Sequence, residues 1–309
     1  MSEMKVAVVT GGTSFLGTAL IDKLTQNNIS VKAIVRAQSQ NADVLKHHQL
    51  TQCIVADMDD TETWCHIIGH ADYFFHLGWD GRGAAGRADS TIQAKNIRDA
   101  INCLVASQKL GCVRFLFAGS QAEYGPTDDF ITEDTCCAPI TEYGKAKLAV
   151  LQRAVKQAEI LNMEYVHARI FSVYGPQDHP WALVPSCIAA LCKGESIALS
   201  DCTQFWNFLH VRDAANALYL LMTAPLSANV YNVASTDTRV LKDFVNVIAA
   251  QAGKGTALYG GRTGTIEKPF GLRPSIERLQ RDTEFAPVVT FQQGVRELIA
   301  LQSNEGEIQ

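Results

Sequence analysis

The chain has 309 residues, of which 47% are hydrophobic and 19% charged, and its formal net charge is −5. This composition excludes a disordered chain, a collagen-like repeat and a disulfide-rich miniprotein. The 27 Lys and Arg against 32 Asp and Glu also argue against a nucleic-acid partner, because phosphate backbones attract basic surfaces. The length suits one large domain or two of medium size.

The cysteine pattern and the hydropathy bear on the cellular compartment. Nine cysteines occur, an odd number, and no CxxC pair is among them, so we expect free thiols and no metal site. The chain contains no run of 18 uncharged apolar residues and no signal-like N-terminal segment. The sequence therefore predicts a cytoplasmic protein without contact to a membrane.

Short apolar runs alternate with amphipathic stretches through the first half. The predicted strands are residues 6–10, 31–35, 53–55, 73–77, 113–117 and 165–170. The predicted helices between them are residues 15–28, 61–69, 90–110 and 143–159. Nearly continuous apolar strands are typical of a parallel sheet covered on both faces. This order predicts an α/β fold of the Rossmann type, with a doubly wound parallel sheet.

The pattern changes after residue 175. Predicted helices at 182–192, 212–222, 242–252 and 291–302 are separated by longer stretches, and 253–274 is predicted as an extended loop. We therefore expect a cofactor-binding domain over residues 1–175. Residues 176–309 are expected to form a smaller mixed α/β lobe for the substrate, some of whose segments can return to the first domain.

A glycine turn follows the first predicted strand. Gly11 permits the turn, and Gly17 allows the next helix to pack closely against the sheet. The start of that helix presents free N–H groups to a pyrophosphate. Ser14 stands where the GxxGxxG pattern has its middle glycine. The residues predicted to line this part of a dinucleotide site are Gly11, Thr13, Ser14, Phe15, Leu16 and Gly17.

Two further positions bear on the cofactor. Arg36 ends the second predicted strand where an NAD site would carry an acidic residue, so it favours NADP(H) over NAD(H), although a surface arginine can also stand there incidentally. Asp57 closes the third strand, where its carboxylate is placed to accept from an adenine amino group, and Met58 is assigned to the same site. The alternative role of Asp57 as a helix N-cap suits Asp60 or Thr61 better.

A tyrosine and a lysine are spaced for acid–base chemistry. Tyr143 and Lys147 lie one helical turn apart, so we expect the lysine to lower the pKa of the phenol. Ser120 ends the fifth predicted strand and can hydrogen-bond the substrate oxygen that Tyr143 protonates. A Tyr-x-x-x-Lys pair alone is common. A pair that follows both a glycine turn and a strand that ends in serine is far more specific.

The sequence resembles the extended short-chain dehydrogenase/reductase family, in its branch of NAD(P)-dependent nucleotide-sugar epimerases, dehydratases and ketoreductases. The matching stretches are residues 10–17, 73–78, 117–125, 143–147, 169–176, 208–213 and 273–294. The resemblance thus extends over nearly the whole chain.

The resemblance implies roles for individual residues. Ser120, Tyr143 and Lys147 match the catalytic residues, with Tyr143 as general acid and base and Lys147 also on the nicotinamide ribose. Asn96 matches an asparagine that supports the active site. The residues that match further cofactor contacts are Leu77, Gly78, Trp79 and Phe171.

The expected substrate is a nucleotide-diphosphate sugar. Ser172 stands where the family often has an asparagine, and Trp206 falls in a run that lacks an expected arginine, so Arg273 is assigned to the diphosphate. Arg82, in a flap-like stretch, is a further candidate whose alternative is a plain flexible loop. The predicted substrate contacts are Ser120, Gln121, Ser172, Trp206, Arg273 and Arg82.

Three functions follow in order. The first is NADPH-dependent reduction of a 4-keto (6-deoxy) sugar nucleotide, and the alternative is a 4-epimerase that retains its cofactor. A non-catalytic dinucleotide-binding protein comes third. Dehydration is disfavoured because Gln121 and Ala122 replace an acidic pair. The resemblance also implies a homodimer through helices 90–110 and 143–159.

Overall fold

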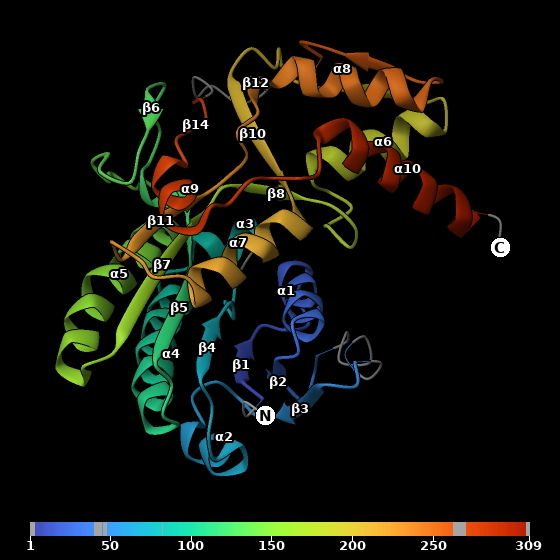
Figure 1. Ribbon diagram of the computed structural model, residues 1–309. Helices are drawn as coiled ribbons and strands as arrows, with labels where there is room; N and C mark the ends of the chain where they lie inside the picture. Colours follow the sequence, from blue (N-terminus) through green and yellow to red (C-terminus); the bar gives the residue numbers. More distant parts are fainter. Residues whose placement is uncertain (1–3, 40–44, 46–47, 82, 262–269, 307–309) are drawn as a thin grey trace.

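The computed structural model describes residues 4–39, 45, 48–81, 83–261 and 270–306. A seven-stranded sheet forms its centre (Figure 1), in the order β11-β7-β5-β4-β1-β2-β3. All neighbouring pairs in it are parallel. Its strands are β1 (Val6–Thr10), β2 (Ser30–Val35), β3 (Thr51–Val55), β4 (Tyr73–His76), β5 (Arg114–Ser120), β7 (Glu164–Ile170) and β11 (Val230–Val233). The predicted doubly wound parallel sheet is confirmed.

Helices cover both faces of this sheet. One face carries α1 (Phe15–Gln26) and α7 (Val211–Thr223); the other carries α2 (Thr61–Ile68), α4 (Ser90–Lys109) and α5 (Glu142–Leu161). Side chains of a strand alternate between the two cores, because successive residues point to opposite faces. In β4, for example, Phe75 belongs to the core under α1 and α7, whereas Phe74 belongs to the core under α2 and α4.

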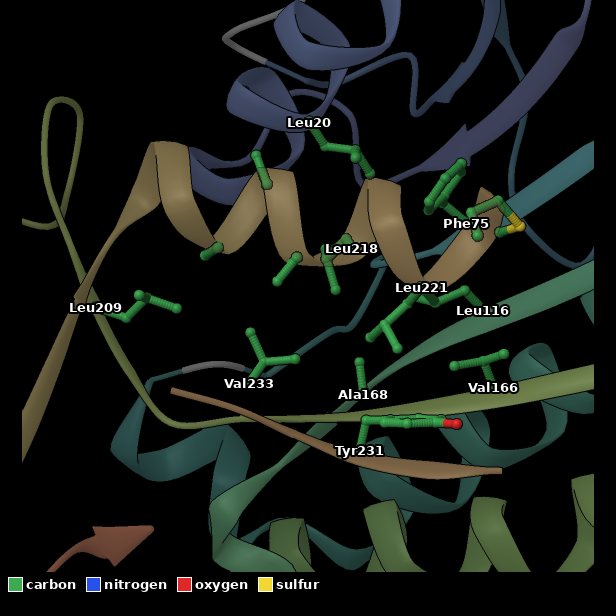
Figure 2. Packing of buried hydrophobic residues seen from close by; sticks show 14 of the residues in the cluster. Leu20, Phe75, Leu116, Val166, Ala168, Leu209, Leu218, Leu221, Tyr231 and Val233 are labelled. Atoms are coloured by element: carbon green, nitrogen blue, oxygen red, sulfur yellow. The ribbon is translucent and has the colours of Figure 1, made fainter. Parts of the chain in front are cut away.

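Helix α7 comes from the second half of the chain but packs on the sheet. Figure 2 shows Leu218 and Leu221 of this helix between Leu20 of α1 and the strand residues Leu116 and Val166. These side chains are fully or almost fully buried. The second half of the chain is thus part of the main hydrophobic core.

The second lobe lies beyond the carboxyl ends of the strands (Figure 1). It is built from small sheets and three helices that share a separate core around Tyr174, Phe208 and Phe291. The strands of the small sheets are β8 (Ser172–Tyr174), β10 (Phe205–His210) and β12 (Thr238–Val240), β9 (Ser196–Ala198) with β13 (Thr256–Leu258), and β6 (Phe130–Ile131) with β14 (Arg273–Pro274). The helices are α6 (Leu183–Cys192), α8 (Leu241–Ala252) and α10 (Phe291–Gly306).

Several elements differ from the sequence-based expectation. The sheet has β11 as a seventh strand, and two short helices, α3 (Ala84–Ala88) and α9 (Glu277–Thr283), were not predicted. The stretch 253–274, expected as one loop, contains β13 and β14 in its described part. These elements are too short to show a periodic pattern. The division at residue 175 stays a prediction, although α7 and β11 come from beyond it.

Three further findings concern the described residues. No helix among them is long and apolar enough to cross a membrane. They contain no cluster of three or more His, Cys, Asp or Glu side chains arranged to hold a metal ion. All nine cysteines lie within the described ranges, and each is a free thiol.

Candidate active site

The strand order reverses between β1 and β4, and the loops after these strands meet. Gly11 follows β1 with a φ of +70°, and a Cβ atom there would lie 2.8 Å from the backbone nitrogen of Gly78 after β4. Only glycine combines this backbone conformation with so close an approach. Ligands of open α/β sheets bind at such a reversal point, outside the carboxyl ends of the strands.

A groove of about 300 Å³ lies at this point. It contains eight of the residues predicted to contact the cofactor: Gly11, Thr13, Ser14, Arg36, Met58, Leu77, Gly78 and Trp79. Its wall includes the N-terminal end of α1, whose free N–H groups favour an anion. The lining residues and this helix end fit a dinucleotide with its pyrophosphate on α1.

Ser14 has a structural role in the phosphate turn. Its hydroxyl group donates to the carbonyl oxygen of Gly11 over 2.7 Å and accepts from the N–H of Gly17 over 3.1 Å, so it caps α1. A Cβ atom on Gly17 would overlap the carbonyl oxygen of Gly11. The serine in the glycine pattern thus keeps the turn closed by its own hydrogen bonds.

Arg36 lies in the groove and already has a partner there. Its guanidinium group donates to the carboxylate of Asp80 over 2.7 Å. Asp80 follows β4 and is fixed by Asn96 of α4, whose side-chain amide binds the backbone N–H of Asp80 over 2.9 Å and its carbonyl oxygen over 3.0 Å. Asn96 is buried, so it acts here through the backbone of the loop that carries Asp80.

Ser120 and Tyr143 meet where β5 ends and α5 begins. Ser120 is the last residue of β5, and Tyr143 lies in the first turn of α5, which Thr141 caps. The pKa of Tyr143 is raised above its ordinary value by burial, and a hydrogen bond with Ser120 and the charge of Arg87 only partly oppose this. The expectation that Lys147 lowers this pKa is therefore wrong: the pKa is raised, and Lys147 is not among the groups that act on it most.

The position of Lys147 explains why it does not lower the pKa of Tyr143. Its ammonium group donates to the carbonyl oxygen of Ala118 over 2.7 Å and lies 3.6 Å from the centroid of the Trp79 ring. It is 5.6 Å from the centroid of the Tyr143 ring. Burial lowers the pKa of Lys147 to about 7. The amine is thus poised to change charge near neutral pH.

Arg87 brings a second cation to the tyrosine. It lies on α3, and its guanidinium carbon is 4.4 Å from the centroid of the Tyr143 ring. Beside it, Ile140 and Trp181 line a shallow hollow together with residues of α3. Arg82, a predicted substrate contact in the same stretch, lies outside the described residues.

No hydrogen bond or ring contact among the described residues brings the remaining predicted cofactor residues to the groove or to Tyr143. Phe15, Leu16 and Asp57 do not line the groove, and Asp57 is exposed while Asp60 caps α2. Phe171 is buried, with its ring centroid 6.3 Å from that of Tyr124. Their cofactor roles stay predictions.

Three of the six predicted substrate residues, Ser172, Trp206 and Arg273, lie in the second lobe. Trp206 packs against Phe208 and Phe270, and Arg273 lies over the ring of Phe205 at 4.8 Å. Ser172 belongs to β8, and Gln121 begins the short 3-10 turn after Ser120. Among the described residues, no hydrogen bond or ring contact joins Trp206 or Arg273 to Tyr143, so these roles stay predictions.

Residues 7–234 match the model of the NAD dependent epimerase/dehydratase family. The chain belongs to this family. It is therefore an enzyme of the NAD-dependent nucleotide-sugar epimerase/dehydratase group.

Individual members of the family resemble the whole chain. A dTDP-glucose 4,6-dehydratase of Neisseria gonorrhoeae is 22% identical, over 96% of this chain and 94% of its own. A UDP-glucose 4-epimerase of Thermotoga maritima, solved with UDP-glucose, has a TM-score of 0.85 at 21% identity, covering 97% and 99% of the two chains. A UDP-N-acetylglucosamine 4-epimerase of Methanobrevibacter ruminantium, solved with UDP-N-acetylmuramic acid, also has a TM-score of 0.85, at 24% identity over 98% and 99%. At these identities the structures establish the shared fold.

Three residues of the site were missed or unassigned in the sequence. Asp80 lies far from Arg36 in the chain, so no local pattern pairs them. Arg87 stands in the same flap-like stretch as Arg82, and no local pattern pairs it with Tyr143. Glu123 had a readable signal, because a serine followed three residues later by glutamate is a capping box, and Ser120 and Glu123 form one.

Proposed function

We propose that this enzyme is a nucleotide-diphosphate-sugar 4-epimerase that retains its dinucleotide. The observation that carries the proposal is the convergence of Ser120 and Tyr143 beside the dinucleotide groove, with the neutral residues Gln121 and Ala122 following the serine. The relatives solved as 4-epimerases add support, since they match this chain over almost its full length.

The chain's own groups suit reversible proton transfer at a sugar hydroxyl. Tyr143 acts as the base in its phenolate form: it takes the proton from the O4 hydroxyl and returns it, while Ser120 donates a hydrogen bond to the same oxygen. The bound dinucleotide supplies hydride acceptance and return at C4. Lys147 sets the local charge around the phenol. Inversion requires the sugar to present its other face before the hydride returns.

Dehydration needs more than these groups. Elimination of water from the sugar requires an acid and a base in addition to the tyrosine. Gln121 and Ala122 supply neither, and the carboxylate of Glu123 is fully buried and accepts hydrogen bonds from His167 and Arg169. A 4,6-dehydratase is therefore disfavoured, although relatives with that name match the chain.

The decisive experiment uses the purified protein with no added cofactor. UDP-, dTDP-, GDP-, ADP- and CDP-sugars carrying deuterium at C4 are incubated with it, and the products are separated and identified by NMR. We expect one pair of 4-epimers to interconvert with deuterium kept at C4. If no sugar nucleotide in the panel is epimerised, the proposal is wrong.

A 4-ketoreductase is the second candidate, and Arg36 favours it. An enzyme that consumes its cofactor generally uses NADPH, and Arg36 stands where a 2′-phosphate would bind. The phosphate would then compete with the carboxylate of Asp80 for Arg36. Stoichiometric loss of NADPH absorbance with a 4-keto sugar nucleotide would establish this reaction instead.

We also infer a homodimer. Helices α4 and α5 carry half-buried apolar side chains, among them Ile97, Ile101, Leu151 and Val155. Two copies of this helix pair would bury these side chains in a four-helix seam. Light scattering on the purified protein should give twice the chain mass, and Ile101→Asp with Leu151→Asp should give the single mass. A wild-type monomer would refute the inference.

A further inference from the structure

A charged cluster lies in the core directly behind the turn that carries Ser120. Its centre is Glu123, the last residue of the 3-10 turn Gln121–Glu123, whose side chain is completely buried. Burying a carboxylate is costly unless it is paired and hydrogen-bonded. A buried charge in this position is therefore expected to have a specific role.

Glu123 receives hydrogen bonds from three directions. Its Oε1 accepts from the backbone N–H of Ser120 over 2.8 Å and lies 2.9 Å from Nε2 of His167. Its Oε2 accepts from Nε of Arg169 over 2.9 Å. On the far side of the imidazole, Nδ1 of His167 lies 2.8 Å from the hydroxyl oxygen of Tyr165. The carboxylate thus ties the catalytic turn to β7.

The sequence leaves space for this cluster. A Cβ atom on Gly119 would lie 2.7 Å from Oε1 of Glu123 and would also clash with the imidazole of His167. Burial pushes the pKa of Glu123 upward, but the charges and hydrogen bonds of His167 and Arg169 outweigh it, so this pKa lies below the ordinary value. Glu123 is therefore an anion at neutral pH.

Lys147 and the imidazole of His167 both lie close to the aromatic ring of Phe117. The ammonium nitrogen is 4.6 Å from the centroid of Phe117, and the His167 ring that contacts Glu123 is 5.2 Å from the same centroid. Within the described part of the chain, Lys147 forms no ion pair. The negative charge of Glu123 opposes the effect of burial on Lys147.

Other groups around Lys147 do not supply this negative charge. Arg87 of α3 is a cation and acts in the opposite direction. His76 of β4 is held neutral, because burial lowers its pKa to about 3. Tyr143 is neutral at this pH, since burial raises its pKa. Of the charges that act on Lys147, Glu123 is the one that favours the ammonium form, and Arg169 shares the same carboxylate.

We propose that Glu123 is a positioning residue of the active site, which fixes the Ser120 turn and serves as the counter-charge of Lys147. It touches neither substrate nor dinucleotide and acts through these two residues. The inference rests on the proposed function only in assigning Ser120 and Lys147 to catalysis.

The test compares Glu123→Gln with two controls. Glu123→Asp keeps the charge, and Glu133→Gln removes another buried glutamate, which accepts from the backbone N–H of Asn232 over 2.9 Å and lies 3.8 Å from Arg278. The ionisation of Lys147 is followed by the ¹³Cε chemical shift of labelled lysine in the protein without substrate, assigned with Lys147→Met. We expect Glu123→Gln to lower the titration midpoint of Lys147 by about one pH unit. Glu123→Asp and Glu133→Gln should leave it unchanged.

Turnover gives a second readout. In Glu123→Gln the pH profile of kcat should move to lower pH with the Lys147 midpoint, while KM for the sugar nucleotide stays within about twofold. A purely structural role would lower kcat without moving the profile. A folded Glu123→Gln protein with an unchanged Lys147 midpoint overturns the proposal.

Two outcomes require a further measurement: a Glu123→Gln protein that does not fold, and a wild-type protein that turns over no sugar nucleotide. If Glu123→Gln does not fold because Arg169 is left unpaired, the double variant Glu123→Gln with Arg169→Met removes both charges, and a smaller downward shift in the Lys147 midpoint is expected. If the wild-type protein turns over no sugar nucleotide, the proposed function fails, but the NMR titration still decides the role of Glu123.

Discussion

The ammonium group of Lys147 lies 3.6 Å from the centroid of the Trp79 indole ring. Such a contact is worth about 2 kcal/mol when it is buried, as it is for Lys147, so the ring helps to keep the amine charged. Trp79 itself is held by a hydrogen bond from its Nε1 to the side-chain oxygen of Gln93, over 3.0 Å. A residue predicted to contact the cofactor thus also forms a wall of the lysine's pocket.

Replacement of the Trp79 ring should lower kcat, because it changes the charge state of Lys147. Trp79→Leu removes the cation–π contact, so the Lys147 midpoint should fall and kcat at pH 8 should drop about tenfold. Trp79→Phe keeps a ring and should retain most of the activity. Steady-state rates across pH measure both variants. Equal losses in the two would show that volume, and not the aromatic face, is what Lys147 requires.

The lowered pKa of Lys147 also predicts how stability depends on pH. The folded protein releases this proton at a pH of about 7, whereas the unfolded chain holds it up to its ordinary value of 10.5. Between these values the unfolded state binds more protons, so the free energy of unfolding rises with pH, by up to about 1.4 kcal/mol per unit from this group. Below pH 7 both states are protonated and the contribution is constant.

Urea unfolding at pH 7.5 and pH 9 checks this prediction. The wild-type protein should gain stability relative to Lys147→Met over this interval, because the variant lacks the titrating group. Parallel curves for the two proteins would contradict it.

The acid–base role of Tyr143 can be separated from binding. Tyr143→Phe removes only the phenolic hydroxyl, and turnover should fall by about 10³-fold, while the dissociation constant of the dinucleotide changes little. Tyr219→Phe, on the outer part of α7, is the matched control and should be as active as the wild type. Full activity of Tyr143→Phe would rule out the tyrosine as the acid and base.

The pair of Arg36 and Asp80 should determine cofactor preference. Arg36→Asp removes the cation and should weaken NADP(H) by about tenfold or more relative to NAD(H), since a charged hydrogen bond is worth roughly 1.5–3 kcal/mol. Asp80→Asn frees Arg36 from its competitor and should strengthen NADP(H). Titration of cofactor fluorescence measures both. Equal changes for the two cofactors would show that Arg36 does not bind the 2′-phosphate.

Gly119 should tolerate no side chain. The added methyl group of Gly119→Ala would press on Glu123 and His167, and overpacking of this kind costs about 1–3 kcal/mol. Gly83→Ala is the control, since nothing lies within 4 Å of its Cβ position. Thermal unfolding compares them. A Gly119→Ala protein as stable as Gly83→Ala would mean that the cluster shifts without cost.

The sheet was predictable from the sequence because its strands are buried on both faces. Runs such as residues 73–77 and 113–117 are apolar except for one residue each, His76 and Arg114, a pattern that few other structures produce. Strand β11 escaped prediction because it is short and carries Asn232, which is buried but satisfied by hydrogen bonds from its amide to the carbonyl oxygens of Ile131 and Ser275. When the hydrogen-bond partners of a buried polar residue are distant in the chain, the local sequence carries no signal of its burial.

The site was predictable where chemistry follows spacing. Tyr143 and Lys147 share a helix, and the glycine turn follows a strand directly. Pairs formed across the fold were not predictable, because Arg36 meets Asp80, and Glu123 meets Arg169, only when separate strands align. The direction of the Tyr143 pKa was missed for the same reason, because burial depends on the whole fold.

Strand β11 limits how this enzyme can be recombined with its relatives. A fragment ending at residue 175 would lack this strand and helix α7, leaving the N–H and C=O groups of β7 as a bare sheet edge and uncovering Leu20 and Leu116. Chimeras that exchange the substrate lobe must therefore carry residues 211–234 with the cofactor-binding half. The unit of exchange is the set of segments that share a core, and not a continuous length of chain.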